Sequence, residues 1–440
     1  MAALPDLAPL IVQALRRQPD LSSAELQTQL GASQATVSRA LAKLTAAGQV
    51  RKVGAARSQR YLLPRTVPGV GSAVQIMQVD ATGQVSLFAQ LVPMAGGGYW
   101  VDEAGGPGAR HDGLPWFLED MRPQGFMGRA FAQAHPALQL GSDPRHWSDE
   151  DVLRALTQFG EDLPGNLLLG ESTYQRFHSL SERTLRVPSA ESYPLLAEQA
   201  MQGTLPGSSA GGEQPKFCTV TAGRSVLVKF SAAGQTQADQ RTRDLLVCEH
   251  LALQTLAQAG LSAARTALFN FQGRVFLEVE RFDRTSSKPS GRIGMVSLLV
   301  FDAQYVGQMD NWAATATRLA ARQLLTPADA NTLALLEAFG LLIANTDRHY
   351  GNISLLQQGK RWALSPVYDM LPMLYAPVAG ELVPRSFAAQ ALQPTTATLA
   401  QWPRARELAQ KFWQTAANDE RLSAEFAATA QVNALHVAGL

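Results

Sequence analysis

The first 65 residues combine apolar positions at helical spacing with two short β-like runs. The apolar stripe of the first predicted helix consists of Leu7, Leu10, Ile11 and Leu15. A capping box at residues 22–25 and a cap at Ser33 predict where two further helices begin. Gly48 ends the third helix, and residues 49–53 and 60–63 then favour two strands around a basic turn. Three helices followed by a hairpin are typical of a winged helix-turn-helix.

The pattern of the remaining chain changes near residue 200. Before this point it is mixed, with short helices expected after Pro115. Beyond it, strand-like runs come first and apolar helices follow, with strands at 225–230 and 276–280 and helices at 239–259, 328–344 and after 400. Strands before helices is the α+β order of a two-lobed domain. We therefore predict an α+β protein in three parts, with bounds at 1–65, 66–200 and 201–440.

The second helix of the predicted helix-turn-helix carries polar residues near its start. Val37, Leu41 and Leu44 would face inward, and the outward residues are Gln34, Thr36, Ser38 and Arg39. That position meets base edges in a DNA major groove. The hairpin would be a wing that contacts phosphates through Arg51, Lys52, Arg57 and Arg60. A small helical domain with a merely polar face is the alternative, and the combination of three helices with a basic hairpin favours DNA binding.

The overall composition limits the kinds of partner that we expect for the protein. The 440 residues are 46% hydrophobic and 17% charged, with a net charge of +1, which gives no case for general affinity for nucleic acid or membranes. No apolar stretch reaches the roughly 20 residues of a membrane-spanning helix. Two cysteines are too few for a disulfide framework. We expect a cytoplasmic protein that does not bind membranes.

The segment from 345 to 352 carries the residues best suited to phosphoryl transfer. A kinase catalytic loop uses an Asp that accepts the proton of the attacking hydroxyl and an Asn five residues later that binds a metal. Asp347 and Asn352 have this spacing. Asp369, expected on a later strand, would bind the metal that bridges the phosphates. Because Asn and Asp also fill ordinary turns, the spacing alone is a weak signal.

Residues upstream add to this signal. Lys229 ends an apolar strand, where its ammonium group would reach the α- and β-phosphates of a nucleotide. Glu249 lies on the core-facing stripe of the following helix, so it either pairs with Lys229 or sits solvated at the edge of the stripe. Small residues in the loop at 208–216 would let backbone N–H groups approach phosphates. By itself that loop indicates only flexibility.

Five motifs in this order resemble the HipA family of bacterial toxin kinases: SSAGGEQPKF (208–217), VKF (228–230), EVERFDR (278–284), NTDRHYGN (345–352) and PVYDM (366–370). Segments 114–129 and 160–170 resemble the N-terminal subdomain of that family, which would occupy residues 66–200. The resemblance implies a kinase-like fold for 201–440. It also implies ATP and Mg²⁺ as cofactors and transfer of phosphate to Ser or Thr of a protein substrate.

The resemblance also implies roles for individual residues. Asp347 would be the catalytic base, with Asn352 and Asp369 as metal ligands. Glu280 and Phe282 would lie by the adenine, and His349 near the phosphates. The complete implied nucleotide site is Ala210, Gly211, Gly212, Glu213, Gln214, Lys216, Lys229, Glu280, Phe282, His349, Asn352 and Asp369.

The family also has a mode of control. A serine in its Gly-rich loop is autophosphorylated, which ejects the loop and silences the kinase. Counting back from Gln214, Ser209 takes that place, with Ser208 as the near alternative.

One feature departs from the family. HipA toxins usually take their DNA-binding function from a separate antitoxin, whereas residues 1–65 would supply one in the same chain. The expected partners are therefore a protein substrate, DNA, and either an antitoxin or a second copy of the chain. Two other functions are considered, a DNA-binding regulator whose kinase-like half senses a ligand without catalysis, and a nuclease with metals on Asp347 and Asp369. The nuclease would give no role to Lys229.

Overall fold

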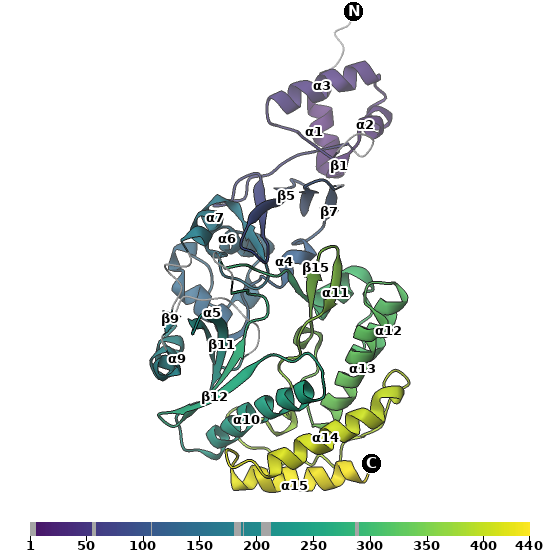
Figure 1. Cartoon of the computed structure of the whole chain (residues 1–440). Coiled ribbons are helices and arrows are strands. Elements are labelled where there is room, and N and C mark those ends of the chain that lie inside the picture. The colour runs from purple at the N-terminus through teal and green to yellow at the C-terminus, as the bar shows by residue number, and fades with distance from the viewer. Residues whose placement is uncertain are drawn as a thin grey trace, which may run out of the picture.

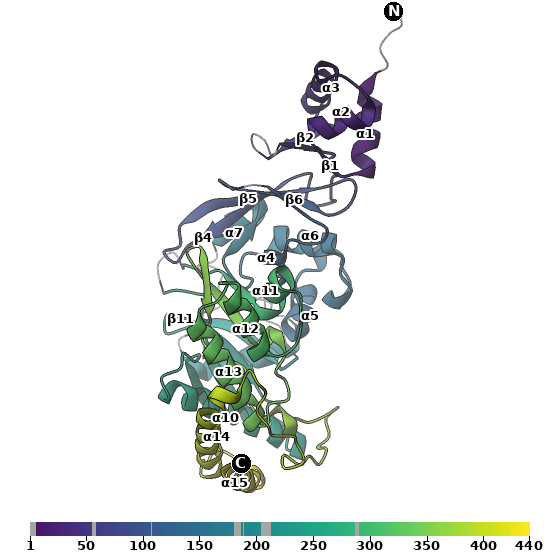
Figure 2. The same cartoon turned by 90° about the vertical axis from the view of Figure 1, so that its right-hand side faces the viewer.

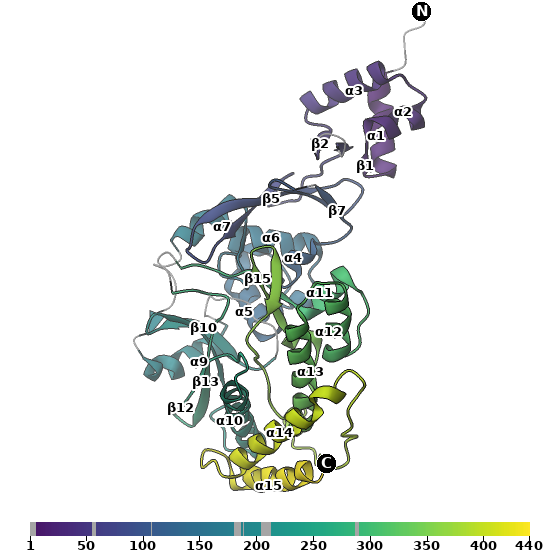
Figure 3. The same cartoon turned by 45° about the vertical axis from the view of Figure 1, so that its right-hand side comes forward.

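The computed structural model describes residues 6–54, 59–106, 108–179, 186–187, 189–203, 213–286 and 290–440. This part of the chain forms three successive regions, a winged helix, a middle domain and a two-lobed domain (Figure 1). The winged helix lies at one end of the molecule (Figures 2 and 3). The final helices, α14 (Trp402–Ala417) and α15 (Ala424–Ala438), lie at the opposite end.

The winged helix is built as its local sequence predicts. Its helices are α1 (Leu7–Arg17), α2 (Ser23–Leu30) and α3 (Gln34–Ala46). Its sheet has the order β1 (Asp20–Leu21), β3 (Arg60–Leu62) and β2 (Arg51–Val53). The predicted capping box forms, since Ser22 Oγ accepts from Glu25 N at 3.2 Å and the Glu25 carboxylate accepts from Ser22 N at 2.7 Å. Strand β1 was not predicted, because two residues are too few to show an alternating pattern.

The middle domain contains a five-stranded antiparallel sheet. Its order is β7 (Ala109–His111), β6 (Tyr99–Glu103), β5 (Val85–Pro93), β4 (Val74–Val79) and β8 (Leu167–Leu169). The helices of the domain are α4 (Trp116–Glu119), α5 (Gly125–Ala134), α6 (Asp149–Phe159) and α7 (Gly170–His178). Buried residues of the sheet and of α6 share one core, including Ile76, Leu91, Leu153 and Leu156. The short helices expected after Pro115 are therefore present.

The winged helix is docked on the middle domain. Val53 and Leu62 of its sheet share a buried cluster with Val92, Met94 and Trp100. Polar contacts surround this cluster. Asp102 Oδ1 accepts from Gly54 N at 3.3 Å and from Trp100 Nε1 at 2.8 Å, and Arg110 lies 3.6 Å from Asp20. Because the cluster draws apolar side chains from both regions, burial holds the two regions together.

The first lobe of the remaining chain is a sheet with one long helix. The sheet order is β12 (Thr266–Phe271), β13 (Arg274–Glu280), β11 (Arg224–Phe230), β10 (Lys216–Thr221) and β9 (Arg186–Val187). Helix α10 (Gln237–Gln258) packs on it, and α9 (Tyr193–Met201) contacts β10. The predicted strands at 225–230 and 276–280 fall within β11 and β13, and the helix predicted at 239–259 corresponds to α10.

The second lobe is mainly helical. Its helices are α11 (Leu298–Tyr305), α12 (Trp312–Ala321), α13 (Pro327–Leu342), α14 and α15. A small sheet with the order β14 (Met295–Ser297), β15 (Ser354–Gln358) and β16 (Arg361–Leu364) lies beside them. The core of this lobe includes Phe301, Trp312, Phe339, Phe412 and Trp413. Throughout the described ranges, no helix combines the length and apolar character needed to cross a membrane.

Candidate active site

Three side chains from both lobes meet at the junction between them. Lys229 on β11 places its Nζ atom 2.7 and 2.8 Å from the two carboxylate oxygens of Glu249 on α10. The same Nζ lies 2.5 Å from Oδ1 of Asp369, which follows β16. Burial alone would lower the pKa of Lys229, but the Asp369 and Glu249 carboxylates outweigh it and raise that pKa. The predicted pair with Glu249 is therefore formed, and the solvated alternative is wrong.

Asp369 has an unusual backbone conformation. Its φ angle is 56°, in the left-handed region that non-glycine residues seldom adopt. It lies beyond the end of β16 at Leu364, so the expectation that it would be on a strand is wrong. Burial alone would raise the pKa of Asp369, but Lys229 and Lys216 together hold it below its usual value. The strained backbone aims a charged carboxylate at Lys229, which is typical of functional sites.

The predicted catalytic loop connects α13 to β15 and is held by its own side chains. Asn352 Nδ2 donates to the backbone oxygen of Asp347 at 2.9 Å, and Asp347 N donates to Asn345 Oδ1 at 3.0 Å. The Asp347 side chain is 50% exposed, which leaves it accessible to a substrate. Burial and the Asp369 charge raise its pKa despite the opposing effect of His349, whose Nε2 is 3.8 Å away. The five-residue spacing thus lets Asn352 bond to the backbone of Asp347 and close the loop between them.

Residues for which the sequence analysis predicted no role form hydrogen bonds with this loop and with each other. Trp312 Nε1 donates to the backbone oxygen of His349 at 3.1 Å. Glu337 on α13 accepts from Arg348 Nε at 3.0 Å and from Trp312 N at 3.1 Å. The Tyr350 hydroxyl accepts from Asp310 N at 2.6 Å. These partners are 11 to 40 positions apart in the sequence, so no local motif marks them.

A second lysine faces the same junction. Lys216 on β10 is the register partner of Lys229 on β11, and its side chain is buried. Burial and the nearby Lys229 charge lower its pKa to about 8, against the opposing effect of Asp369. Two lysines on paired strands thus direct positive charge at one place, as a polyphosphate site requires.

In the predicted phosphate-binding loop, Gln214 and Glu213 both have hydrogen-bond partners within the chain. Gln214 Nε2 donates to the backbone oxygen of Phe230 at 2.8 Å. Glu213 accepts from both Nη atoms of Arg129 on α5, at 3.2 and 2.5 Å. The remaining residues predicted in this loop lie outside the described residues: Ser208, Ser209, Ala210, Gly211 and Gly212.

The predicted adenine-side residues lie at the end of β13, with Glu280 as its last residue and Phe282 just beyond it. The half-buried Glu280 carboxylate lies 3.9 Å from both Arg224 and Arg265. The Phe282 ring centre is 5.6 Å from that of Tyr368, the residue before Asp369. Phe282 therefore lies at the same junction as the charged residues.

The predicted DNA-binding residues divide into two groups. Gln34, Ser38 and Arg39 are exposed near the start of α3, and Thr36 beside them is half-buried. In the wing, Lys52 is exposed, whereas Arg51 donates to Gln90 of the middle domain.

Arg60 of the wing is likewise held within the protein, because it lies 3.4 Å from Asp20 and 3.3 Å from Glu25. Arg57 lies outside the described residues. The face of α3 that carries Gln34, Ser38 and Arg39 is thus exposed. Arg51 and Arg60, two of the predicted phosphate contacts, already have partners within the chain.

Comparisons with known proteins match each part of the chain. Residues 9–51 match the family model described as winged helix-turn-helix DNA-binding, and residues 70–178 match the middle domain of YjjJ-like toxins. Residues 208–435 match the HipA-like C-terminal domain.

Two individual proteins are similar over most of their length. Toxin YjjJ of Escherichia coli (strain K12) is 39% identical over 436 residues, which cover 97% of this chain and 96% of the relative. A solved structure of Shewanella oneidensis MR-1, titled as the toxin–antitoxin system HipA, HipB and its operator DNA complex, matches with a TM-score of 0.57 and 17% identity. That match covers 82% of this chain and 96% of the solved chain, and it shows the fold alone.

These matches confirm the predicted fold class, a two-lobed HipA fold of α+β type behind a winged helix-turn-helix. They also confirm the resemblance on which the expected site rested. The chain belongs to the family of HipA-like toxins that includes Toxin YjjJ, with a winged helix-turn-helix domain in front of its HipA-like part.

Proposed function

We propose that this chain is an ATP- and Mg²⁺-dependent protein kinase that phosphorylates serine or threonine and binds DNA through α3. The observation that carries the proposal is the position of Lys229, bonded to Glu249 and Asp369 at the junction of the lobes. A kinase needs this lysine–glutamate pair and a metal-binding aspartate in place together. Family membership supports the same reading.

The residues of the site suit the two cofactors. Mg²⁺ prefers oxygen ligands and is usually bound by one or two carboxylates together with substrate phosphates. Asp369 and the amide of Asn352 provide such ligands. When bound, the ion would neutralise charge on the phosphates of ATP. Lys229 and Lys216 would bind those phosphates from the sheet side, so the nucleotide is held between the two lobes.

Asp347 would act on the protein substrate. Its half-exposed carboxylate would accept the proton of a serine or threonine hydroxyl as that oxygen attacks the phosphorus atom. A raised pKa improves a carboxylate as a base, provided that it stays ionised near neutral pH. The hydrogen bonds of Asn345 and Asn352 to the loop backbone would keep this carboxylate in place.

The proposal is tested by incubating the purified full chain with labelled ATP and Mg²⁺. We expect phosphate on protein with the wild type and a loss of at least about 100-fold with Asp347→Asn or Asp369→Asn. Glu420→Gln removes an exposed carboxylate of the same lobe and should leave labelling unchanged. Undiminished labelling in both site variants would show that the kinase assignment is wrong. A wild type that binds DNA but labels nothing would favour the non-catalytic regulator.

We further propose that the chain phosphorylates itself on Ser209 or Ser208 and that its DNA contact lies in the same chain. The solved relative is described with a separate HipB and operator DNA. Here the fused winged helix offers the DNA contact, which leaves an antitoxin or a second copy as candidate protein partners. Light scattering of the purified chain with and without DNA distinguishes a monomer from a self-assembled dimer.

A further inference from the structure

Residues 281–286 and 290–294, which follow β13 and precede β14, lie against each other. Thr285 N donates to the backbone oxygen of Gly291 at 2.9 Å, and Ile293 N donates to that of Asp283 at 3.1 Å. The segment then continues into β14 of the second lobe. Its conformation therefore affects both lobes at the junction where the proposed nucleotide binds.

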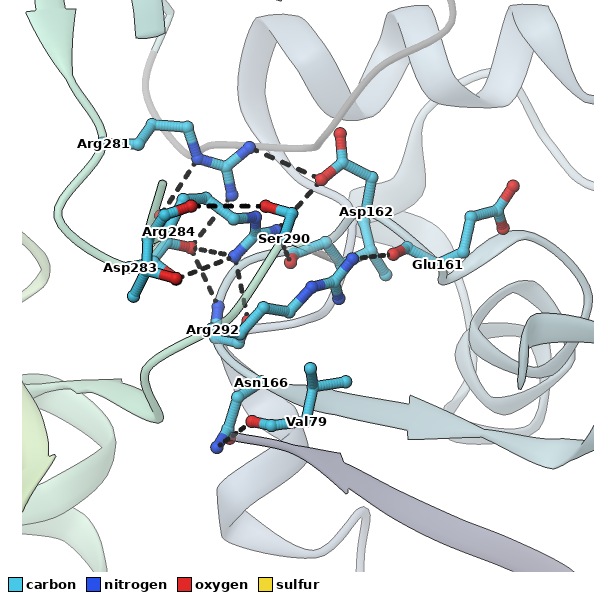
Figure 4. Close-up of polar contacts among 12 residues, drawn as sticks. Val79, Glu161, Asp162, Asn166, Arg281, Asp283, Arg284, Ser290 and Arg292 are labelled. Carbon is cyan, nitrogen blue, oxygen red and sulfur yellow. Dashed lines mark hydrogen bonds and ion pairs between the residues drawn. The ribbon is translucent and has the colours of Figure 1, made fainter. Parts of the chain in front are cut away.

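The base of this segment is bound to the middle domain by a buried ionic network (Figure 4). Arg284 Nη2 lies 3.0 Å from Oδ1 of Asp162, and Arg281 Nη1 lies 3.7 Å from the same oxygen. Both arginines also pair with Asp283, at 2.9 Å for Arg281 and 2.7 Å for Arg284. Asp162 belongs to the loop between α6 and β8, so the network joins two regions that are 118 or more positions apart in sequence.

The backbone of the middle domain adds to the contact. Gly165 N donates to Asp283 Oδ2 at 3.2 Å, and Arg284 Nη1 donates to the Gly165 oxygen at 3.0 Å. Arg284 Nη2 also donates to the oxygen of Leu163 at 2.8 Å. Each of these donors has a defined direction, so the network sets the orientation of the segment as well as its distance from the middle domain.

Phe282 lies between two residues of this network and contacts the second lobe. Arg281 and Asp283 contact Asp162 and Gly165 of the middle domain, whereas Phe282 between them packs against Tyr368, next to Asp369. Because Phe282 is flanked by Arg281 and Asp283, the bonds that fix these two residues also restrict the position of Phe282.

Most of the network is shielded from solvent, so its ion pairs are little screened by water. The side chains of Arg281, Asp283 and Arg284 are 10%, 6% and 4% exposed, and that of Asp162 is 29% exposed. Burial alone would raise the pKa of Asp162, but the Arg281 and Arg284 charges outweigh it and hold that pKa below its usual value. Removing the Asp162 charge leaves the two buried arginines with Asp283 as their shared carboxylate partner, which is unfavourable.

We propose that Asp162 of the middle domain is a positioning residue for the nucleotide pocket, acting through Arg281 and Arg284 on the placement of Phe282. This inference rests on the proposed kinase function. It assigns the middle domain a part in nucleotide binding, although none of the nucleotide-site residues expected from the motifs belongs to that domain.

The test compares steady-state kinetics of the full chain with ATP as the varied substrate. Asp162→Asn keeps the side-chain shape and removes the charge, and we expect the KM for ATP to rise about tenfold while kcat changes less than about threefold. The matched control is Asp149→Asn, which removes an Asp–Arg pair with Arg122 inside the middle domain, 2.7 Å long. It should leave both constants within about twofold of the wild type. An unchanged KM in a folded Asp162→Asn protein would overturn the proposal.

A double-mutant cycle separates positioning from general loosening. If Asp162 acts through Phe282, the effect of Asp162→Asn on KM should largely disappear in a Phe282→Ala background. Additive effects would contradict the proposal. Should Asp162→Asn fail to fold, Arg284→Lys keeps the charge but loses the bonds to Leu163 and Gly165, and the same rise in KM is expected. A wild type without ATP-dependent labelling would reject the kinase function and this inference together, whereas normal labelling with unchanged KM rejects the inference alone.

Discussion

Lys229 and Glu249 form a buried bidentate ion pair, with Nζ 2.7 and 2.8 Å from the two carboxylate oxygens and side chains 9% and 1% exposed. The pair joins the middle of the first-lobe sheet to its long helix. Since Asp369 contacts the same Nζ, one ammonium group links the sheet, the helix and the second lobe. This arrangement makes Glu249 important for both stability and activity.

We expect Glu249→Ala to lower the free energy of unfolding by about 3–5 kcal/mol, because it leaves the Lys229 charge buried with one partner fewer. Labelling from ATP should fall at least about tenfold, since the lysine loses its orientation. Denaturant titration and the labelling assay measure the two effects. Glu198→Ala is the matched control, because it removes an exposed carboxylate paired with Arg274 and should cost less than about 1 kcal/mol. Equal stability of the two variants would contradict the prediction.

Autophosphorylation is predicted on Ser209, with Ser208 as the alternative site. A phosphate adds nearly two negative charges at neutral pH, and beside the nucleotide site it would compete with ATP for the same donors. We therefore expect the modified protein to have lower activity. Mass spectrometry should find phosphate in this loop in the wild type and none in Asp347→Asn. An unmodified loop in an active enzyme would exclude this control.

The exposed face of α3 is predicted to read DNA sequence. Arg39→Ala in the full chain should weaken binding to the preferred sequence by about 1–3 kcal/mol and affect random DNA less. Lys52→Ala should weaken both alike and lower the salt dependence by about one charge. Arg145→Ala, an exposed arginine of the middle domain paired with Asp143, is the control and should have no effect. Binding that is indifferent to Arg39 would place the DNA contact elsewhere.

The docked wing makes the winged helix dependent on the rest of the chain. Trp100 of the middle domain covers Val53 and Leu62, so Trp100→Ala should destabilise the protein by about 3–5 kcal/mol. A fragment of residues 1–65 would expose the same two side chains and should melt at a lower temperature than the domain does within the full chain. Calorimetry of both proteins checks this. A fragment as stable as the intact domain would show that the contact contributes little.

Acid should destabilise the protein through His250. Burial, together with the Arg421 charge, lowers the pKa of His250 to about 4, whereas an unfolded histidine titrates near 6.5. Between these values the unfolded chain binds the proton and the folded chain does not. The stability contributed by neutral His250 is therefore full above about pH 6.5 and is lost as the pH falls towards about 4.

The variant His250→Asn keeps a polar group towards Thr266, whose Oγ1 lies 2.8 Å from Nδ1, and cannot be protonated. We expect its unfolding free energy to depend less on pH in this window, by at most about 1.4 kcal/mol per pH unit. Denaturant titrations at several pH values measure the slope. His146→Asn, at an exposed position, should keep the wild-type slope.

Local sequence was sufficient wherever neighbours along the chain decide the structure. The capping box at Ser22 and Glu25 and the strand that carries Lys229 follow from residues a few positions apart, and the structure contains both, although the strand runs one residue further, to Phe230. The loop from Asp347 to Asn352 is likewise closed by a bond between residues five positions apart. The order of these motifs was enough to indicate the family, since each motif is a local pattern.

Only the tertiary structure decided which charges meet. Glu249 was compatible with a paired or a solvated position until the packing of α10 on the sheet placed it against Lys229. Arg51 and Arg60 were predicted to contact DNA phosphates from the wing. In the structure Arg51 bonds to Gln90, and Arg60 pairs with Asp20 and Glu25. Asp162 reaches Arg284 across 122 positions. An ion pair forms only when two charged groups come within a few ångströms of each other, and for groups far apart in the sequence this depends on the packing of the fold. The sequence therefore determined which charged groups exist, and packing alone determined their partners.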